Sequence, residues 1–111
     1  MVLPVSKSRL VIFDMKQGDR LKLLPATLQD FVDIWMHPTY CGATGFTDDC
    51  QKYAQEDYDE HIRHLKYQGE GYEWKFYWIE SEDPLVYQVS DDPGGDLEWQ
   101  FEVPAKLVES I

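Results

Sequence analysis

The sequence predicts an α+β fold in which a mainly antiparallel five-stranded sheet carries two helices on one face, in the order ββααβββ. Three features of the 111-residue chain lead to this prediction. Two segments place apolar residues three or four positions apart, as amphipathic helices do. The segments before and after them alternate apolar and polar residues, as half-buried strands do. Glycine, proline and aspartate separate these segments and indicate turns.

Two strands open the predicted order. Arg9 to Asp14 is a short run rich in β-branched and aromatic residues, and Arg20 to Leu24 alternates polar and apolar residues. The residues at 17–19 include a glycine, which favours a tight turn between the two strands. We therefore expect a pair of strands that ends at Pro25.

The first predicted helix covers residues 27–36. Thr27 is followed three residues later by Asp30, which resembles a capping box at a helix start. The apolar residues that follow recur at helical spacing. The next segment, His37 to Phe46, contains a proline and two glycines and is expected to be a loop.

The second predicted helix covers residues 48–68. Thr47 is a suitable N-cap, and the two aspartates after it lie at the positive end of the helix dipole. The apolar positions continue at a spacing of three to four residues, and Gly69 is the predicted stop. We expect this helix to be the longest element of the fold.

Three strands complete the predicted sheet, at 72–79, 85–89 and 97–103. The first has Tyr72, Trp74, Phe76 and Trp78 on one side, and the last alternates apolar residues with Glu98, Gln100 and Glu102. One face of the sheet is therefore expected to be core and the other acidic and hydrated. The residues from 104 to 111 are expected to form a tail with one helical turn.

The length and composition are those of one domain, which we assign to residues 1–111. The hydrophobic fraction of 43% suffices for a core, and the sequence contains no linker, repeat or low-complexity tract. The longest apolar run, Leu10 to Phe13, is too short for a membrane span. The chain starts without the pattern of a secretory signal, and two cysteines do not make a disulfide framework. We therefore expect a cytoplasmic protein.

The acidic charge restricts the classes of partner. The formal net charge is -11, from 10 Lys and Arg against 21 Asp and Glu. Residues 1–22 hold five basic and two acidic side chains, so the other 89 residues hold five basic and nineteen acidic ones. Such a surface repels phosphate, which argues against direct binding of nucleic acid. It favours a basic protein partner, because complementary fields speed and orient the encounter.

One part of the chain resembles a known family. Arg20 to Trp35 (RLKLLPATLQDFVDIW) resembles the opening strand and helix of the GNAT acetyltransferases, and Phe76 to Ser90 resembles their central hairpin. The family's pyrophosphate loop, a Gln/Arg-x-x-Gly-x-Gly/Ala pattern that opens a helix, has no counterpart in this chain. The resemblance therefore implies no catalytic residue and no coenzyme here.

A histidine-containing helix face is the strongest candidate for a metal site. Asp57, His61 and His64 are spaced so that they share one face of the second helix, and three such ligands can hold zinc. The spacing matches no known zinc motif, and two histidines on a polar helix are typically solvated. We therefore expect neither a metal nor another cofactor.

The cysteines do not indicate an enzyme. Cys50 follows two aspartates, whose negative charge disfavours the thiolate that nucleophilic catalysis requires. Its place on the apolar stripe of the second helix indicates a core residue. We assign no catalytic residue and favour a non-catalytic protein.

Aromatic residues are more numerous than a small core needs, with four Trp, seven Tyr and five Phe. Both sides of the strand at 72–79 are rich in rings, so some of them should be exposed and contact a partner or ligand. The alternative function that follows is a small-molecule-binding protein or enzyme. Its aromatic-lined pocket of about 300 Å³ or more would lie between the second helix and the sheet, with Tyr58, His61 or His64 at its mouth. Such a pocket would suit a flat or cationic ligand. The candidate aromatic contacts are Trp74, Tyr77, Trp78 and Trp99.

The sequence as a whole favours a small acidic binding protein of the inhibitor or immunity type. Its acidic contact surface is expected on the second helix and on the last strand. A homodimer through an unpaired edge strand or the exposed rings is compatible with either function. The acidic candidates are Glu56, Asp59, Glu60, Glu98, Gln100 and Glu102.

Overall fold

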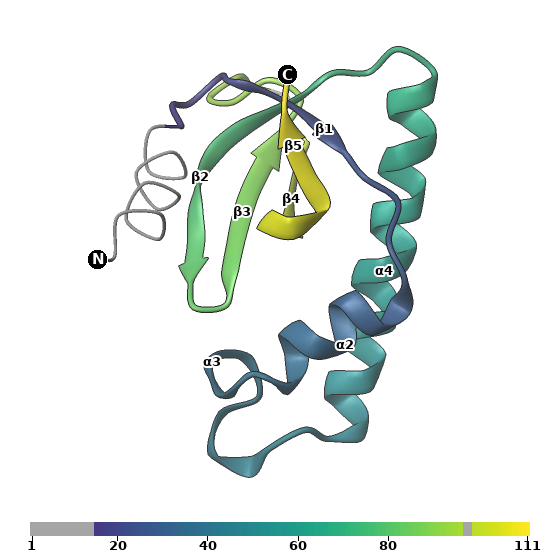
Figure 1. The fold of residues 1–111 in the computed structure, drawn as a ribbon, viewed down its shortest axis with the longest axis vertical. Coiled ribbons are helices and arrows are strands. Elements are labelled where there is room, and N and C mark those ends of the chain that lie inside the picture. The colour runs from purple at the N-terminus through teal and green to yellow at the C-terminus, as the bar shows by residue number, and fades with distance from the viewer. Residues whose placement is uncertain (1–14, 97–98) are drawn as a thin grey trace, which may run out of the picture.

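The computed structural model describes residues 15–96 and 99–111 and has the α+β architecture that the sequence predicts. An antiparallel five-stranded sheet has the order β4-β3-β2-β1-β5, and the helices pack beside it (Figure 1). The predicted strand at Arg9 to Asp14 lies outside the described residues. The elements are β1 (Arg20–Leu23), α2 (Leu28–Met36), α3 (Pro38–Cys41), α4 (Asp48–Gly69), β2 (Trp74–Glu82), β3 (Leu85–Ser90), β4 (Gln100–Pro104) and β5 (Val108–Ser110).

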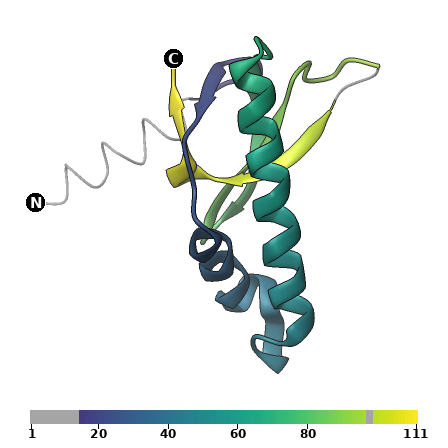
Figure 2. The same cartoon turned by 90° about the vertical axis from the view of Figure 1, so that its right-hand side faces the viewer.

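The long helix α4 and the shorter α2 pack against each other beside the sheet. Figure 2 shows α4 running along the whole molecule, with α2 against part of its length. Both helices begin at the predicted caps. The Asp30 carboxylate accepts a hydrogen bond from the Thr27 backbone N–H at 2.8 Å, and Thr47 Oγ1 accepts one from the Cys50 N–H at 3.3 Å. Among the described residues, no helix is both long and apolar enough to cross a membrane.

The segment from His37 to Phe46 is not the loop that its proline and two glycines predict. It contains α3 and a 3₁₀ turn at Gly42–Thr44. Pro38 is the first residue of α3, where its fixed φ suits a helix and its missing N–H costs nothing. Gly42 then adopts a φ of 69° and ends the helix, a conformation that other residues rarely adopt.

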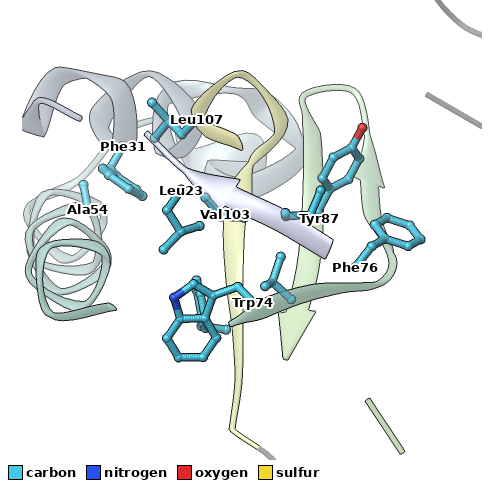
Figure 3. Close-up of a cluster of buried hydrophobic side chains, with 11 residues drawn as sticks. Leu23, Phe31, Ala54, Trp74, Phe76, Tyr87, Val103 and Leu107 are labelled. Carbon is cyan, nitrogen blue, oxygen red and sulfur yellow. The ribbon is translucent and has the colours of Figure 1, made fainter. Parts of the chain in front are cut away.

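The core lies between the curled sheet and the two helices. Figure 3 shows Phe31 of α2 and Ala54 of α4 facing Leu23 and Trp74 of the sheet. Trp74 is fully buried, and its indole Nε1 donates a hydrogen bond to the His64 backbone carbonyl at 3.2 Å. This bond fixes the sheet to α4 and pairs the buried indole N–H.

A side chain of α4 also continues the hydrogen bonding of β1. Gln68 Oε1 accepts a hydrogen bond from the Leu23 N–H at 2.8 Å, and Gln68 Nε2 donates one to the Leu23 carbonyl at 3.2 Å. The amide thus occupies both backbone groups of Leu23, as a neighbouring strand would. The end of β1 is held to the helix by this pair.

The strand β2 departs from the simple alternation that its sequence predicts. Phe76 pairs with Val89 but Trp78 pairs with Gln88, so one extra residue is accommodated between them as a bulge. The bulge moves Trp78 to the face opposite Phe76 and returns Ile79, the partner of Tyr87, to the core. The expectation that Trp78 shares a face with Trp74 and Phe76 is therefore wrong.

The last residues form more structure than the expected tail. A 3₁₀ turn at Ala105–Leu107 is followed by β5, which pairs antiparallel with β1. Leu107 is 5% exposed and packs in the core, so the turn is anchored by burial of an apolar side chain. Figure 1 shows β5 lying in front of β4. These two strands are the edges of the sheet, and they overlap in this view because the sheet twists strongly between them.

Candidate functional site

Trp78, Gln88 and Glu102 form a row across three neighbouring strands. Trp78 of β2 pairs with Gln88 of β3, which pairs with Glu102 of β4, so the three side chains share the face opposite the core. Trp78 is 42% exposed, and its indole Nε1 donates a hydrogen bond to Glu80 Oε2 at 2.7 Å. This face therefore combines an accessible aromatic ring with carboxylates.

Carboxylates from three elements converge beside this row and form what we name the acidic cluster. Tyr40 of α3 packs among them, and its hydroxyl donates a hydrogen bond to Glu102 Oε1 at 3.2 Å. Trp35 of α2 donates its indole N–H to Asp57 Oδ2 at 2.8 Å. The acidic cluster consists of Asp57 and Glu60 of α4, Glu80 of β2 and Glu102 of β4.

The carboxylates of the acidic cluster lie close enough to act on one another. Burial raises the pKa of Glu102, and the negative charges of Glu80, Asp57 and Glu60 raise it further. The pKa of Glu60 is likewise raised, first by burial and then by Asp57. Burial and the charge of Glu102 also raise the pKa of Tyr40, which keeps its hydroxyl protonated as a donor. The cluster is thus a region of repulsion between negative charges.

Positive charge within the described chain compensates this repulsion only weakly. Arg63 approaches Glu60 at 3.9 Å, and both side chains are at least 40% exposed, so water screens the pair. Asp57, Glu80 and Glu102 form no ion pair with another residue of the ranges 15–96 and 99–111. The acidic cluster is therefore a net negative surface that a cation from outside can approach.

The structure brings together part of the predicted acidic surface. Glu60 and Glu102 belong to the acidic cluster, and Gln100 lines a small pocket together with Glu60. Glu56 and Asp59 are exposed on α4, outside the cluster as defined, although Glu56 raises the pKa of Asp57 after the larger effect of burial. The remaining candidate, Glu98, lies outside the described residues.

The four predicted aromatic contacts fall in three different places. Trp78 lies beside the acidic cluster with Tyr77 against it, their ring centroids 4.1 Å apart. Trp99, directly before the start of β4, is 46% exposed and packs against the ring of Tyr67. Trp74 is fully buried, so its assignment as a contact residue is wrong, because the period-two pattern does not say which face of a strand is covered.

A pocket does occur between α4 and the sheet, where the alternative function requires one. Its volume is about 220 Å³, below the expected 300 Å³. His64 lines it, whereas Tyr58 and His61 do not. The lining residues are Glu60, Arg63, His64, Tyr67, Trp99 and Gln100.

The two histidines of the candidate metal-binding face contact separate groups. His61 Nε2 lies 2.7 Å from the Leu24 carbonyl, and the His64 ring stacks on Phe101 with centroids 3.9 Å apart. Both histidines are buried, which corrects the expectation that they are solvated. No group of three or more His, Cys, Asp or Glu side chains in the described ranges could hold a metal ion.

The places of Tyr40 and Glu80 at the acidic cluster could not be predicted from the sequence. Tyr40 lies in the segment expected to be a loop, and no local pattern brings it to Glu102. Glu80 is two residues beyond Trp78 and bonds to it, but the irregular register of β2 decides that Trp78 turns away from the core. The only available signal was the density of acidic residues around each, which is common throughout the chain.

The chain has no match among protein-family models, curated proteins or solved structures. The resemblance of Arg20 to Trp35 to the GNAT acetyltransferases is therefore supported by no comparison.

Proposed function

We propose that this protein is a small, non-catalytic binding protein whose acidic surface engages a basic protein partner, as an inhibitor or immunity-type protein does. The observation that carries the proposal is the acidic cluster. Four carboxylates from α4, β2 and β4 share one region, and the pKa of Glu102 is raised first by burial and then by the charges of the other three. A field built by carboxylates from three elements is coherent, because their positions are fixed by the fold.

A cationic side chain of a partner would relieve the repulsion within the acidic cluster. Each carboxylate that gains an arginine or lysine neighbour exchanges a repulsive interaction for an attractive one. Arginine suits this role because its planar group can bind two carboxylate oxygens at once. The isolated protein therefore favours a basic partner over a neutral one.

Exposed rings beside the cluster supply the short-range contacts that charge alone does not. Trp78 and Tyr77 pack against each other next to Glu80, and tryptophan and tyrosine commonly dominate the binding energy of interfaces. The carboxylates would speed and orient the encounter, and the rings would slow dissociation. This arrangement supports binding of a folded basic surface.

The proposal is tested with a fluorescent nona-arginine peptide as the probe, titrated by anisotropy at several salt concentrations. The test variant combines Glu60→Gln, Glu80→Gln and Glu102→Gln. The matched control combines Glu70→Gln, Asp96→Asn and Glu109→Gln, which removes the same charge from exposed positions outside the cluster.

We expect the native protein to bind the peptide with an affinity that falls as salt is added. The cluster variant should lose about tenfold in affinity at low salt, as three weakened ion pairs of roughly 0.5 kcal/mol each imply. The control should lose less than threefold. Equal losses in both variants, or an affinity that salt does not change, would refute the role of the cluster.

The pocket between α4 and β4 supports the alternative function, a site for a flat or cationic ligand. Tyr67 and Trp99 offer ring faces, and Glu60 lies at the same pocket. A panel of cationic aromatic compounds tested by thermal shift checks this alternative. A shift that Trp99→Ala abolishes would favour it over the protein-binding function, and no shift with any compound would reject it.

A further inference from the structure

A large groove lies on a different part of the molecule from the acidic cluster. Its volume is about 820 Å³, within the range of roughly 300–1,000 Å³ that small-molecule sites have. It opens between α2, the turn from β2 to β3, and the C-terminal strand β5, whose positions Figure 1 shows. The groove and the acidic cluster have no residue in common. Its apolar lining includes Met15, Leu21, Ile34, Leu85, Tyr87 and Val108.

The floor of the groove is part of the folded core. Leu21 is 2% exposed and Tyr87 is 4% exposed, so both are held by packing on the side away from the opening. Val108 faces the same side because it pairs with Leu23, two residues from Leu21 on the same strand. The apolar wall is thus preformed and rigid, as binding sites for small molecules usually are.

The lysine at the groove has an oppositely charged partner, whereas the two aspartates there have none among the described residues. Lys106 Nζ lies 3.0 Å from Asp30 Oδ1, so its positive charge has a partner outside the groove lining. Asp19 and Asp33 accept hydrogen bonds from uncharged donors, the Lys16 backbone N–H at 2.8 Å and the Gln29 side-chain amide at 2.7 Å. Neither forms an ion pair with a residue of the described part of the chain.

We propose that this groove binds a small amphiphilic molecule with an apolar body and one cationic amine. The apolar lining fits the body of the molecule, since burial of each CH₂ group contributes about 0.8 kcal/mol. The carboxylates of Asp19 and Asp33 fit the amine. An anionic head group is disfavoured because Lys106, the one lysine among the described lining residues, is already paired with Asp30. The inference does not depend on the function proposed for the acidic cluster.

Three probes with the same alkyl chain separate the contribution of charge from that of apolar contact. Octylammonium, octanol and octanoate are titrated into the 111-residue protein at neutral pH, and binding is followed through NMR shifts of the side-chain methyl groups. We expect saturable shifts confined to groove residues such as Leu21, Ile34 and Val108. Octylammonium should bind about two- to fivefold more tightly than octanol for each carboxylate that it approaches. Octanoate should bind most weakly.

Two pairs of variants locate the site. Asp33→Asn should weaken octylammonium binding about two- to fivefold and leave octanol binding unchanged, whereas Asp49→Asn, outside the groove, should change neither. Ser110→Trp fills the groove from an exposed position that pairs with Leu21, and should abolish binding of all three probes. Glu109→Trp places the same ring on the opposite side of β5 and should leave binding intact.

Several results would overturn the proposal. Equal affinities for octylammonium and octanol would show that the groove does not recognise the charge of an amine. Shifts confined to residues outside the groove would show that the probes bind elsewhere. A dimer in sedimentation velocity that Ser110→Trp dissociates would assign the groove to a second copy of the chain. A gain in probe affinity on combining Leu10→Ser with Ile12→Ser would assign it to the chain's own N-terminal segment.

Discussion

Replacing His64 by phenylalanine should protect the protein from mild acid. His64 is 6% exposed, stacks on Phe101 and packs edge to face against Trp74. Burial of the ring outweighs its hydrogen bond with the Glu60 backbone, which favours the charged form, so a proton added to His64 would carry a charge into the core. Phenylalanine keeps a planar ring at the position and cannot be protonated.

The magnitude follows from the pKa of His64. Burial lowers it from 6.5 to about 4, and the charge of Arg63 acts in the same direction. The unfolded chain therefore binds this proton at a higher pH than the folded protein, so stability is lost as the pH falls from above 6.5 towards 4. The difference between the two pKa values corresponds to about 3 kcal/mol.

Urea unfolding at a series of pH values between 7 and 4 measures this effect as a difference between two proteins. The difference is needed because carboxylates with raised pKa values, such as Glu102, have the opposite effect. Their protonation stabilises the folded protein as the pH falls through the upper part of the same range. The free energy of unfolding of His64→Phe, relative to that of the native protein, should rise by about 3 kcal/mol between pH 7 and pH 4. A His64→Phe protein whose stability falls in parallel with the native one would refute the reasoning.

Three further substitutions test particular contacts. Gln68→Leu removes both hydrogen bonds to Leu23 and should lower the free energy of unfolding by about 2 kcal/mol in urea titrations, because it leaves backbone groups unpaired. Asp30→Ala removes the helix cap at Thr27 and should lower it by about 1 kcal/mol; an unchanged urea midpoint would contradict the role of the cap. Glu102→Gln should raise stability by a few tenths of a kcal/mol, roughly the value of one exposed charge interaction, and should lower the pKa of Glu60 in NMR titrations.

The elements whose local signals agree with one another could be predicted from the sequence. The start of α4 was predicted at Asp48 because Thr47 caps it, and its end was predicted within one residue because the helical spacing stops near Gly69. The strand order could not be predicted in the same way. Pairing of β5 with β1 joins residues about 85 positions apart, and no local pattern records such a contact.

The histidines show a different limit of the sequence. A histidine among charged residues on a helix is ambiguous, since the same spacing suits a solvated face and a face packed on a sheet. In the fold, His61 meets the Leu24 carbonyl and His64 meets Phe101, both of them contacts with distant segments. Burial of these polar rings was therefore decided by tertiary packing, which overrides the polar character of the helix.

The candidate surface depends on one irregularity that period-two reasoning excludes. A regular β2 would place Trp78 on the core face with Trp74 and Phe76, leaving the acidic face without this ring. The bulge after Phe76 turns Trp78 outward, where it meets Glu80 and lies in line with Glu102. The same bulge turns Ile79 inward, so the core keeps an apolar residue at that level of the strand. The shift therefore exposes a tryptophan without creating a gap in the core, which is the combination that an interface built on a small domain requires.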